Sequence, residues 1–250
     1  MNKIKTLVIT GGNKGIGLSI SKYFLTNGYF VIVGGRSSID SKLLKNKKLR
    51  FFKMDATSET AHINLVKNAI KLTGKIDVFI NNVGYSEWRP IEKINLDFLN
   101  NIIQTNLVSY FWGCKTAINY MKKGGSIINI SSIAGKRGSK NNSAYSATKF
   151  AINGLTQSLS KEVGKKNIRV NAVCPVLIKT NGLSLALKSK YSPAKNKINE
   201  FFKSFAKTQS ALNRLPTSEE VSQLCFYLAS DFSSAITGQC INIDCGVFPQ

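Results

Sequence analysis

Acidic residues are scarce in this 250-residue sequence, which has 13 Asp and Glu against 35 Lys and Arg and a formal net charge of +22. A charge of that size attracts polyanions and acidic ligands, so nucleic acid is one candidate partner. The sequence lacks zinc-finger spacing, a basic zipper and an aromatic-basic RNA-binding motif, however. Many lysines stand beside asparagines, as in KNKK, and we favour the interpretation that the charge is a compositional bias without a specific partner.

Histidine is almost absent: His62 is the one histidine of the sequence, in a segment predicted to be a surface helix. A Ser-His-Asp hydrolase or a histidine-ligated metal site is therefore not expected.

The cysteines are five in number and irregularly spaced, which argues against a disulfide framework and against a zinc site. They are Cys114, Cys174, Cys225, Cys240 and Cys245.

Long hydrophobic runs are also missing, since none approaches the roughly 18 residues that cross a bilayer. The first residues, MNKIK, make a short basic lead into a strand and lack the apolar core of a signal peptide. We therefore expect a cytoplasmic protein without a membrane segment. The length and the 43% hydrophobic content favour one α/β domain that spans residues 1–250.

Buried-strand patterns alternate with helical patterns along most of the chain. Repeated strand-helix units of this kind predict a parallel sheet with right-handed crossovers, in which ligands bind at the carboxyl ends of the strands. The predicted strands cover residues 5–10, 29–37, 49–57, 75–84, 126–132, 168–176 and 238–246.

A glycine-rich turn, TGGNKGIG, follows the first strand and precedes a helical pattern that stops at Gly28. This strand-turn-helix context is the one that a nucleotide-binding site requires. Gly11, Gly15 and Gly17 would let the backbone turn tightly and approach a pyrophosphate at the helix N-terminus. The spacing is G-x-x-x-G-x-G, and the alternative is a turn without a ligand.

The end of the second strand is where the adenosine ribose of a dinucleotide is recognised, usually by Asp or Glu when the ligand is NAD. Here the chain has Arg36 and Ser37 and no carboxylate, which favours the 2′-phosphate of NADP. Lys14 can reach the same phosphate. The alternative for Arg36 is a solvated loop charge. At the end of the third strand, Asp55 is placed to meet the adenine ring.

The fourth strand runs into Asn82 and Gly84 at the same predicted edge of the sheet. Residues 95–122 then read as a long helical segment that contains Asn106. A buried asparagine in a helix needs hydrogen-bond partners. A bond to a neighbouring backbone carbonyl and a functional role are equally good explanations of Asn106.

Tyr145 and Lys149 stand four residues apart in a predicted helix at 144–163, so both face the same side. A neighbouring ammonium favours the phenolate and would bring the pKa of the tyrosine down from roughly 10 toward a useful range. Ser132, at the end of the fifth strand, could offer a second donor to the oxygen of a bound carbonyl. A lone Tyr-x-x-x-Lys pattern is more often surface packing, and only the other motifs favour catalysis.

Residues 180–214 lose clear strand character, and their basic side chains greatly outnumber the single acidic residue, Glu200. Phe201, Phe202 and Phe205 lie in a helical run within this segment. We expect the segment to fold over the site as a basic substrate lid.

The motifs together resemble the short-chain dehydrogenase/reductase family over essentially the whole chain, and most closely its branch of 3-oxoacyl-[acyl-carrier-protein] reductases. The resemblance implies a Rossmann-type doubly wound fold with a seven-stranded parallel sheet, helices on both faces and assembly as a homotetramer or homodimer. It rests on TGGNKGIG, Asp55, NNVG, Asn106, Ser132, YSATK, IRVNAVCP and SSAITGQCINIDCG.

The family pattern implies that Tyr145 gives the proton, Ser132 steadies the carbonyl, and Lys149 binds the nicotinamide ribose and lowers the pKa of Tyr145. Asn106 would hold a water that connects Lys149 to solvent, and no metal is expected. The residues expected to bind NADP(H) are Thr10, Gly11, Asn13, Lys14, Gly15, Ile16, Gly17, Arg36, Ser37, Asp55, Ala56, Asn82, Gly84, Tyr145, Lys149, Pro175, Ile178 and Thr180.

Three positions depart from the family pattern. Val176 follows Pro175 where a glycine is usual, and Val83 replaces an alanine in NNVG. The tail has Asp244-Cys245-Gly246 where two glycines are common, which puts the details of a dimer contact in doubt.

We therefore expect an NADPH-dependent carbonyl reductase. The substrate suggested by the resemblance is a 3-oxoacyl thioester on acyl carrier protein, an acidic partner that Lys123, Lys166 and the lid could attract. The alternative substrate is a small ketone or a sugar-derived carbonyl, because the lid is long and basic. A non-enzymatic alternative is a basic nucleic-acid-binding protein on the same fold.

Overall fold

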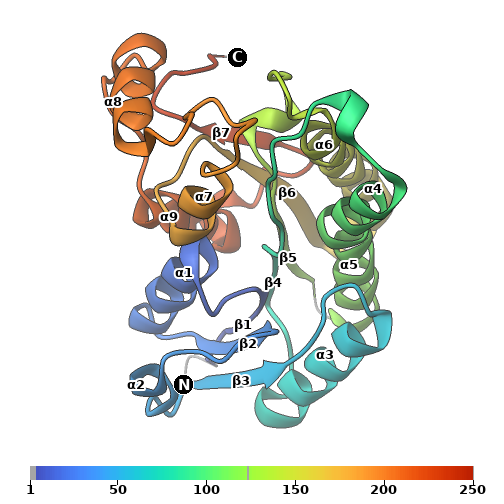
Figure 1. Ribbon diagram of the computed structural model, residues 1–250. Coiled ribbons are helices and arrows are strands. Elements are labelled where there is room, and N and C mark those ends of the chain that lie inside the picture. The colour runs from blue at the N-terminus through green and yellow to red at the C-terminus, as the bar shows by residue number, and fades with distance from the viewer. Residues whose placement is uncertain (1–3, 123, 250) are drawn as a thin grey trace.

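The computed structural model describes residues 4–122 and 124–249 (Figure 1). The expectations that concern the basic lead at residues 1–3 and Lys123 fall outside this part. The strands are β1 (Thr6–Thr10), β2 (Phe30–Gly35), β3 (Leu49–Lys53), β4 (Val78–Asn81), β5 (Gly125–Ile130), β6 (Ile168–Pro175) and β7 (Cys240–Ile243).

Helices connect successive strands and cover the sheet. The α-helices are α1 (Gly15–Thr26), α2 (Ser41–Leu44), α3 (Glu59–Thr73), α4 (Leu96–Ile103), α5 (Ser109–Tyr120), α6 (Ser143–Val163), α7 (Asn181–Ala186), α8 (Ile198–Gln209) and α9 (Ser218–Ala229). A π-helical turn spans Gln104–Val108, and 3₁₀ turns span Ile91–Lys93, Ile133–Gly135, Gly164–Lys166 and Asp231–Ser233.

The sheet confirms the predicted fold class. Within the described residues, the strands form one seven-stranded sheet in the order β3-β2-β1-β4-β5-β6-β7, and every neighbouring pair is parallel. The chain winds outward from β1 through β2 to β3 and then returns to β4 on the other side of β1. A crevice opens at the carboxyl ends of two strands where the winding direction reverses, here β1 and β4.

Two apolar layers sandwich this sheet (Figure 1). On one face α1 and α9 pack through Ile20, Phe24 and Leu228 onto the sheet. On the other face α3, α5 and α6 form a second core that includes Leu65 and Ile152. Strands that are buried on both faces, such as β1, need apolar side chains at nearly every position, which explains their continuous hydrophobic runs.

Capping residues explain where several helices begin and end. Ser58 accepts a hydrogen bond from Ala61 N at the start of α3, and Gly74, with φ of +78°, ends that helix in the left-handed region. Thr217 caps the start of α9 and forms a reciprocal capping box with Glu220.

The strands lie where they were predicted, but several end earlier. β3 stops at Lys53, because the Asp55 carboxylate accepts hydrogen bonds from Thr57 N and Thr57 Oγ1, both at 2.9 Å, and so forms a turn. The helical segment predicted at 95–122 is also interrupted, since a π-helical turn separates α4 from α5 at Asn106.

His62 is fully buried, and the prediction of a surface position for it was wrong. The ring centre lies 6.4 Å from that of Phe79 on the central strand β4, and its Nε2 donates to the carbonyl oxygen of Ala56 at 2.9 Å. Nδ1 has no partner among the described residues. Burial lowers the pKa of His62 below 6.5, and the hydrogen bond to the Ala56 carbonyl and the nearby Glu59 carboxylate only partly oppose this effect. The helical periodicity pointed to burial, since His62 lies three and four residues before the buried Leu65 and Val66 of α3, but the usual polarity of histidine favoured the surface prediction.

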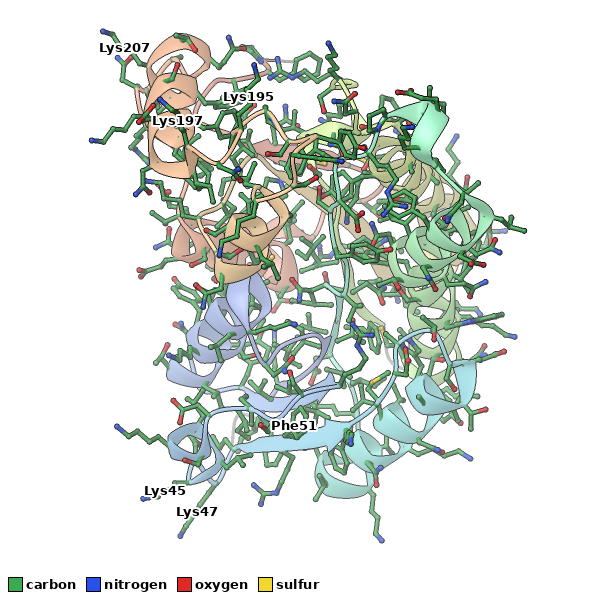
Figure 2. The ribbon with its side chains drawn as sticks, in the orientation of Figure 1. Lys45, Lys47, Phe51, Lys195, Lys197 and Lys207 are labelled. Carbon is green, nitrogen blue, oxygen red and sulfur yellow. The ribbon has the colours of Figure 1, made fainter. Side chains whose placement is uncertain are left out.

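The positive charge is spread over the surface. Figure 2 shows Lys195, Lys197 and Lys207 around α8, whereas Lys45 and Lys47 lie beside α2 at the opposite end of the molecule. Such a distribution fits a lysine-rich composition better than a single polyanion-binding patch. In the described part of the chain, no helix is both long and apolar enough to span a membrane.

Burial of His62 predicts a specific loss of stability in mild acid. Well above pH 6.5 the imidazole is neutral in both states. As the pH falls through 6.5, the unfolded chain takes up a proton that the folded chain resists, so stability falls. The slope for one proton is at most about 1.4 kcal/mol per pH unit. Urea denaturation of the wild type and of His62→Gln between pH 7.5 and 5.5 measures it. We expect a smaller decline for the variant; parallel declines would contradict the assignment.

Candidate active site

A cavity of about 1500 Å³ lies at the carboxyl ends of the strands. Segments that follow β1 to β6 line it, together with α7 and α8. Thr10 and Asn106 are the two predicted site residues that do not line the cavity. Those that do are Gly11, Asn13, Lys14, Gly15, Ile16, Gly17, Arg36, Ser37, Asp55, Ala56, Asn82, Gly84, Ser132, Tyr145, Lys149, Pro175, Ile178 and Thr180.

The glycine-rich turn forms one end of the cavity. Gly11 and Gly15 have φ of +67° and +54°, in the left-handed region where glycine is favoured. A Cβ on Gly17 would overlap with the Gly11 carbonyl oxygen, so α1 packs directly on the turn. The first turn of α1 has no side-chain cap and no acidic residue. Its backbone N–H groups therefore make an anion-binding site.

Asn82 fixes this turn to the end of β4. Its side-chain amide donates to the carbonyl oxygens of Thr10 at 3.2 Å and Gly11 at 3.0 Å. Its backbone N–H donates to Thr10 Oγ1 at 3.2 Å. Thr10 thus joins β1 to β4 beneath the cavity, which explains why it is buried and not part of the wall.

The end of β2 is held beside the same turn. The Asn13 amide donates to the Ser37 carbonyl at 2.7 Å and to Ser37 Oγ at 2.9 Å. This contact brings exposed Lys14 and Arg36 to one rim of the cavity.

Asp55, which follows β3, is ionised more readily than an ordinary aspartate. Its pKa lies below the usual value, mainly because Thr57 donates to the carboxylate, and Arg36 adds a smaller electrostatic contribution.

The predicted catalytic groups lie at the other end of the cavity. Tyr145 and Lys149 are one turn apart on α6, with Lys149 Nζ 5.7 Å from the centre of the Tyr145 ring. Ser132 precedes the 3₁₀ turn after β5, where its Oγ accepts from Ala134 N at 3.1 Å and donates to the Pro175 carbonyl at 3.4 Å. The ends of β5 and β6 and the start of α6 therefore meet here.

Burial dominates the electrostatics of this group. The pKa of Tyr145 is raised above 10.0 because burial disfavours the phenolate, and the Ser132 hydroxyl only partly opposes the shift. The expectation that Lys149 lowers this pKa stays a prediction. Burial lowers the pKa of Lys149 itself to about 7, and its Nζ donates to the Ile130 carbonyl at 2.9 Å. A partly neutral amine that is turned toward a carbonyl stabilises the phenolate weakly.

Asn106 has backbone partners, which was one of the two explanations open from the sequence. Its Oδ1 accepts from Tyr85 N at 3.0 Å, and its Nδ2 donates to the Tyr85 carbonyl at 2.8 Å. The π-helical turn directs the side chain toward the loop after β4. Asn106 therefore holds this loop, which forms part of the cavity wall.

Residues 180–214, the predicted lid, form α7, α8 and the connection between these helices. Trp88, Leu187, Ala194 and Phe202 form a small apolar cluster that fastens the segment to the loop after β4. Phe201 and Phe205, on α8, line the cavity. Trp88 and Arg137 also line it and were missed, because each lies in a loop without a recognisable motif.

The positions that depart from the family pattern are well packed. Val176 belongs to an apolar cluster with Ile133 and Val247, which the C-terminal segment completes. Val83 lines the cavity beside the glycine-rich turn. Cys245 adopts φ of +57°, a left-handed conformation in which a glycine would be less strained.

Comparison with known proteins supports the same interpretation. The family model described as Enoyl-(Acyl carrier protein) reductase matches residues 11–248. The chain belongs to the short-chain dehydrogenase/reductase family. It is accordingly an oxidoreductase, of a family that uses NAD(P)(H).

Individual members of the family align over nearly the whole chain. The 3-oxoacyl-[acyl-carrier-protein] reductase of Chlamydia muridarum is 36% identical over 255 residues, 97% of each chain. The 3alpha-hydroxysteroid dehydrogenase of Mediterraneibacter gnavus is 31% identical and covers 98% of this chain and 97% of its own. Among solved structures, the aldohexose dehydrogenase of Thermoplasma acidophilum superposes with a TM-score of 0.88 at 30% identity, covering 98% of this chain and 94% of its own.

Proposed function

We propose that this short-chain dehydrogenase/reductase is an NADPH-dependent carbonyl reductase in which Tyr145 donates a proton to the carbonyl oxygen. The observation that carries the proposal is that one cavity joins an anion-binding helix N-terminus to the buried group of Ser132, Tyr145 and Lys149. Either feature alone is common. Their presence at the two ends of one cavity fits a dinucleotide and a carbonyl substrate.

The glycine-rich end fits the phosphates of a nicotinamide cofactor. The uncapped N–H groups of α1 can bind the pyrophosphate, and Gly15, which lines the cavity without a side chain, leaves the backbone open to approach. Ala56 and Asp55 border the space for the adenine ring. A cofactor bound in this way supplies the hydride that reduces the carbonyl carbon.

At the other end, the side chains of the protein hold and move the proton. Tyr145 keeps its proton at neutral pH, because burial raises its pKa, and can transfer it to an oxygen that gains charge. Ser132 Oγ can donate to the same oxygen and so orient the carbonyl. With a pKa of about 7, Lys149 can bind the ribose hydroxyls and stabilise the phenolate in its charged form.

The remaining residues would orient the nicotinamide ring. Pro175 and Ile178 lie on the strand end and loop beside Ser132, and Thr180 caps α7 by accepting from Leu183 N at 3.2 Å. Asn106 holds the loop after β4, and in this proposal it also holds a water that connects Lys149 to solvent. Residues 180–214 act in this proposal as the substrate lid.

The preference for NADP rests on the charges at the end of β2. Arg36 and Lys14 stand on one rim of the cavity, tied together through the Asn13–Ser37 hydrogen bonds. The residues at this strand end include no carboxylate that could bind a 2′-hydroxyl. Two cations so placed favour a 2′-phosphate.

For the substrate, we favour a 3-oxoacyl thioester carried on acyl carrier protein. The sequence similarity to 3-oxoacyl-[acyl-carrier-protein] reductases supports this choice. The apolar surfaces of Phe201 and Phe205 in the cavity fit an acyl chain, and Lys166 and the basic lid could attract an acidic carrier. A small or sugar-derived carbonyl is the second candidate, favoured by the similarity to an aldohexose dehydrogenase.

We also propose a homotetramer or homodimer that acts in the cytoplasm. Phe111 on α5 and Phe150 on α6 are each 48% exposed, and Phe232 is 90% exposed. Large apolar side chains on the surface favour contacts between subunits.

Nucleic-acid binding remains a less favoured alternative, because it would not use the buried group of Ser132, Tyr145 and Lys149.

The proton-donor role is tested by Tyr145→Phe. This variant should lower kcat by about 10² to 10⁴-fold, because it removes the general acid, and should still bind NADPH. Steady-state kinetics and fluorescence titration with NADPH measure the two effects. Retained turnover would rule out Tyr145 as the donor.

The cofactor preference is tested by Arg36→Asp. Loss of a charge-assisted hydrogen bond and repulsion of the 2′-phosphate should lower the NADPH/NADH ratio of kcat/KM by at least about tenfold. Lys42→Asp makes the same change of net charge on exposed α2, outside the cavity, and is the matched control. An unchanged ratio in Arg36→Asp would contradict the assignment.

The substrate class is tested by a panel. With NADPH in excess, 3-oxoacyl thioesters should give a higher kcat/KM than small ketones or aldoses. The acyl chain can contact Phe201 and Phe205, whereas a small carbonyl cannot. A preference for the small carbonyls would select the second candidate.

A further inference from the structure

Tyr110 is a buried tyrosine to which the proposed reaction gives no role. It lies on α5, one turn after Asn106, and its side chain is 1% exposed. Its hydroxyl donates to the Ile130 carbonyl at 2.7 Å. Lys149 Nζ donates to the same carbonyl oxygen at 2.9 Å. Two side-chain donors, one of them a proposed catalytic residue, therefore share one acceptor.

The position of Ile130 explains why its carbonyl needs side-chain donors. Ile130 is the last residue of β5, and the last pairing of β4 with β5 joins Asn81 to Asn129. The Ile130 carbonyl thus lies just beyond this ladder, in a buried environment. Lys149 Nζ lies 5.3 Å from the centre of the Tyr110 ring and 5.7 Å from that of Tyr145, so the ammonium lies close to both rings.

We propose that Tyr110 is a positioning residue for Lys149, because its hydroxyl keeps the Ile130 carbonyl paired when the ammonium turns to the ribose of a bound nicotinamide nucleotide. The proposal rests on the proposed function, in which Lys149 binds that ribose. With both donors present, the ammonium can leave the carbonyl at little cost. Without the hydroxyl, its departure would leave a buried acceptor unpaired, which is strongly disfavoured.

The surroundings of Tyr110 favour a permanent donor. Burial raises its pKa well above 10.0, so the hydroxyl keeps its proton over the working pH range. The ring itself packs in the core beneath the sheet with Cys114 and Ala117. A change to phenylalanine keeps this packing and removes only the hydrogen bond.

The test compares two ligands on Tyr110→Phe by isothermal titration. NADPH contains the nicotinamide ribose, whereas 2′,5′-ADP contains only the adenosine half. The Kd for NADPH should rise about tenfold, the usual effect of an unpaired buried acceptor, and the Kd for 2′,5′-ADP should stay within twofold. In kinetics, KM for NADPH should rise by more than kcat falls. Tyr120→Phe, which removes a hydroxyl from the other end of α5, is the matched control.

A double-mutant cycle shows whether Tyr110 acts through Lys149. In a Lys149→Met background there is no ammonium to position, so adding Tyr110→Phe should leave the Kd for NADPH unchanged. Three results would each overturn the proposal. Tyr110→Phe could raise the Kd for NADPH equally in both backgrounds, raise the Kd for both ligands equally, or leave the Kd for NADPH unchanged. If the wild type binds 2′,5′-ADP but neither NADPH nor NADH, the proposed function has failed instead.

Discussion

The proposed chemistry depends on one buried amine. Lys149 is 4% exposed, and burial lowers its pKa to about 7, where a small change of surroundings alters its charge. It can stabilise a phenolate at Tyr145 only while charged, and only if it faces the reacting end of the cavity. The packing of α6 on the sheet and the Ile130 carbonyl at the end of β5 together determine where this amine lies.

The parallel sheet explains how distant segments supply one site. All carboxyl ends of its strands meet at one edge, so the loops after them converge although they are far apart in sequence. Buried polar contacts then fix these loops to one another: Asn82 joins the ends of β1 and β4, Asn13 joins the glycine-rich turn to the end of β2, and Asn106 holds the loop after β4. Hydrogen bonds of these three asparagine side chains thus stabilise the cavity wall.

Local patterns were sufficient to predict the sheet, the glycine-rich turn and the helical spacing of Tyr145 and Lys149, because each depends on residues close in sequence. Features that depend on distant neighbours could not be predicted. The pKa of Tyr145 is raised by an environment built from several segments. Tyr110 looked like any core aromatic, since its partner, Ile130, is 20 residues away.

A crystal structure of the protein with NADPH would test the central claim most directly. The account predicts the pyrophosphate at the N-terminus of α1, the nicotinamide ring beside the Tyr145 hydroxyl and the Lys149 amine on the ribose hydroxyls. A nucleotide bound elsewhere, or a Tyr145 hydroxyl directed away from the nicotinamide with no contact between Lys149 and the ribose, would contradict it.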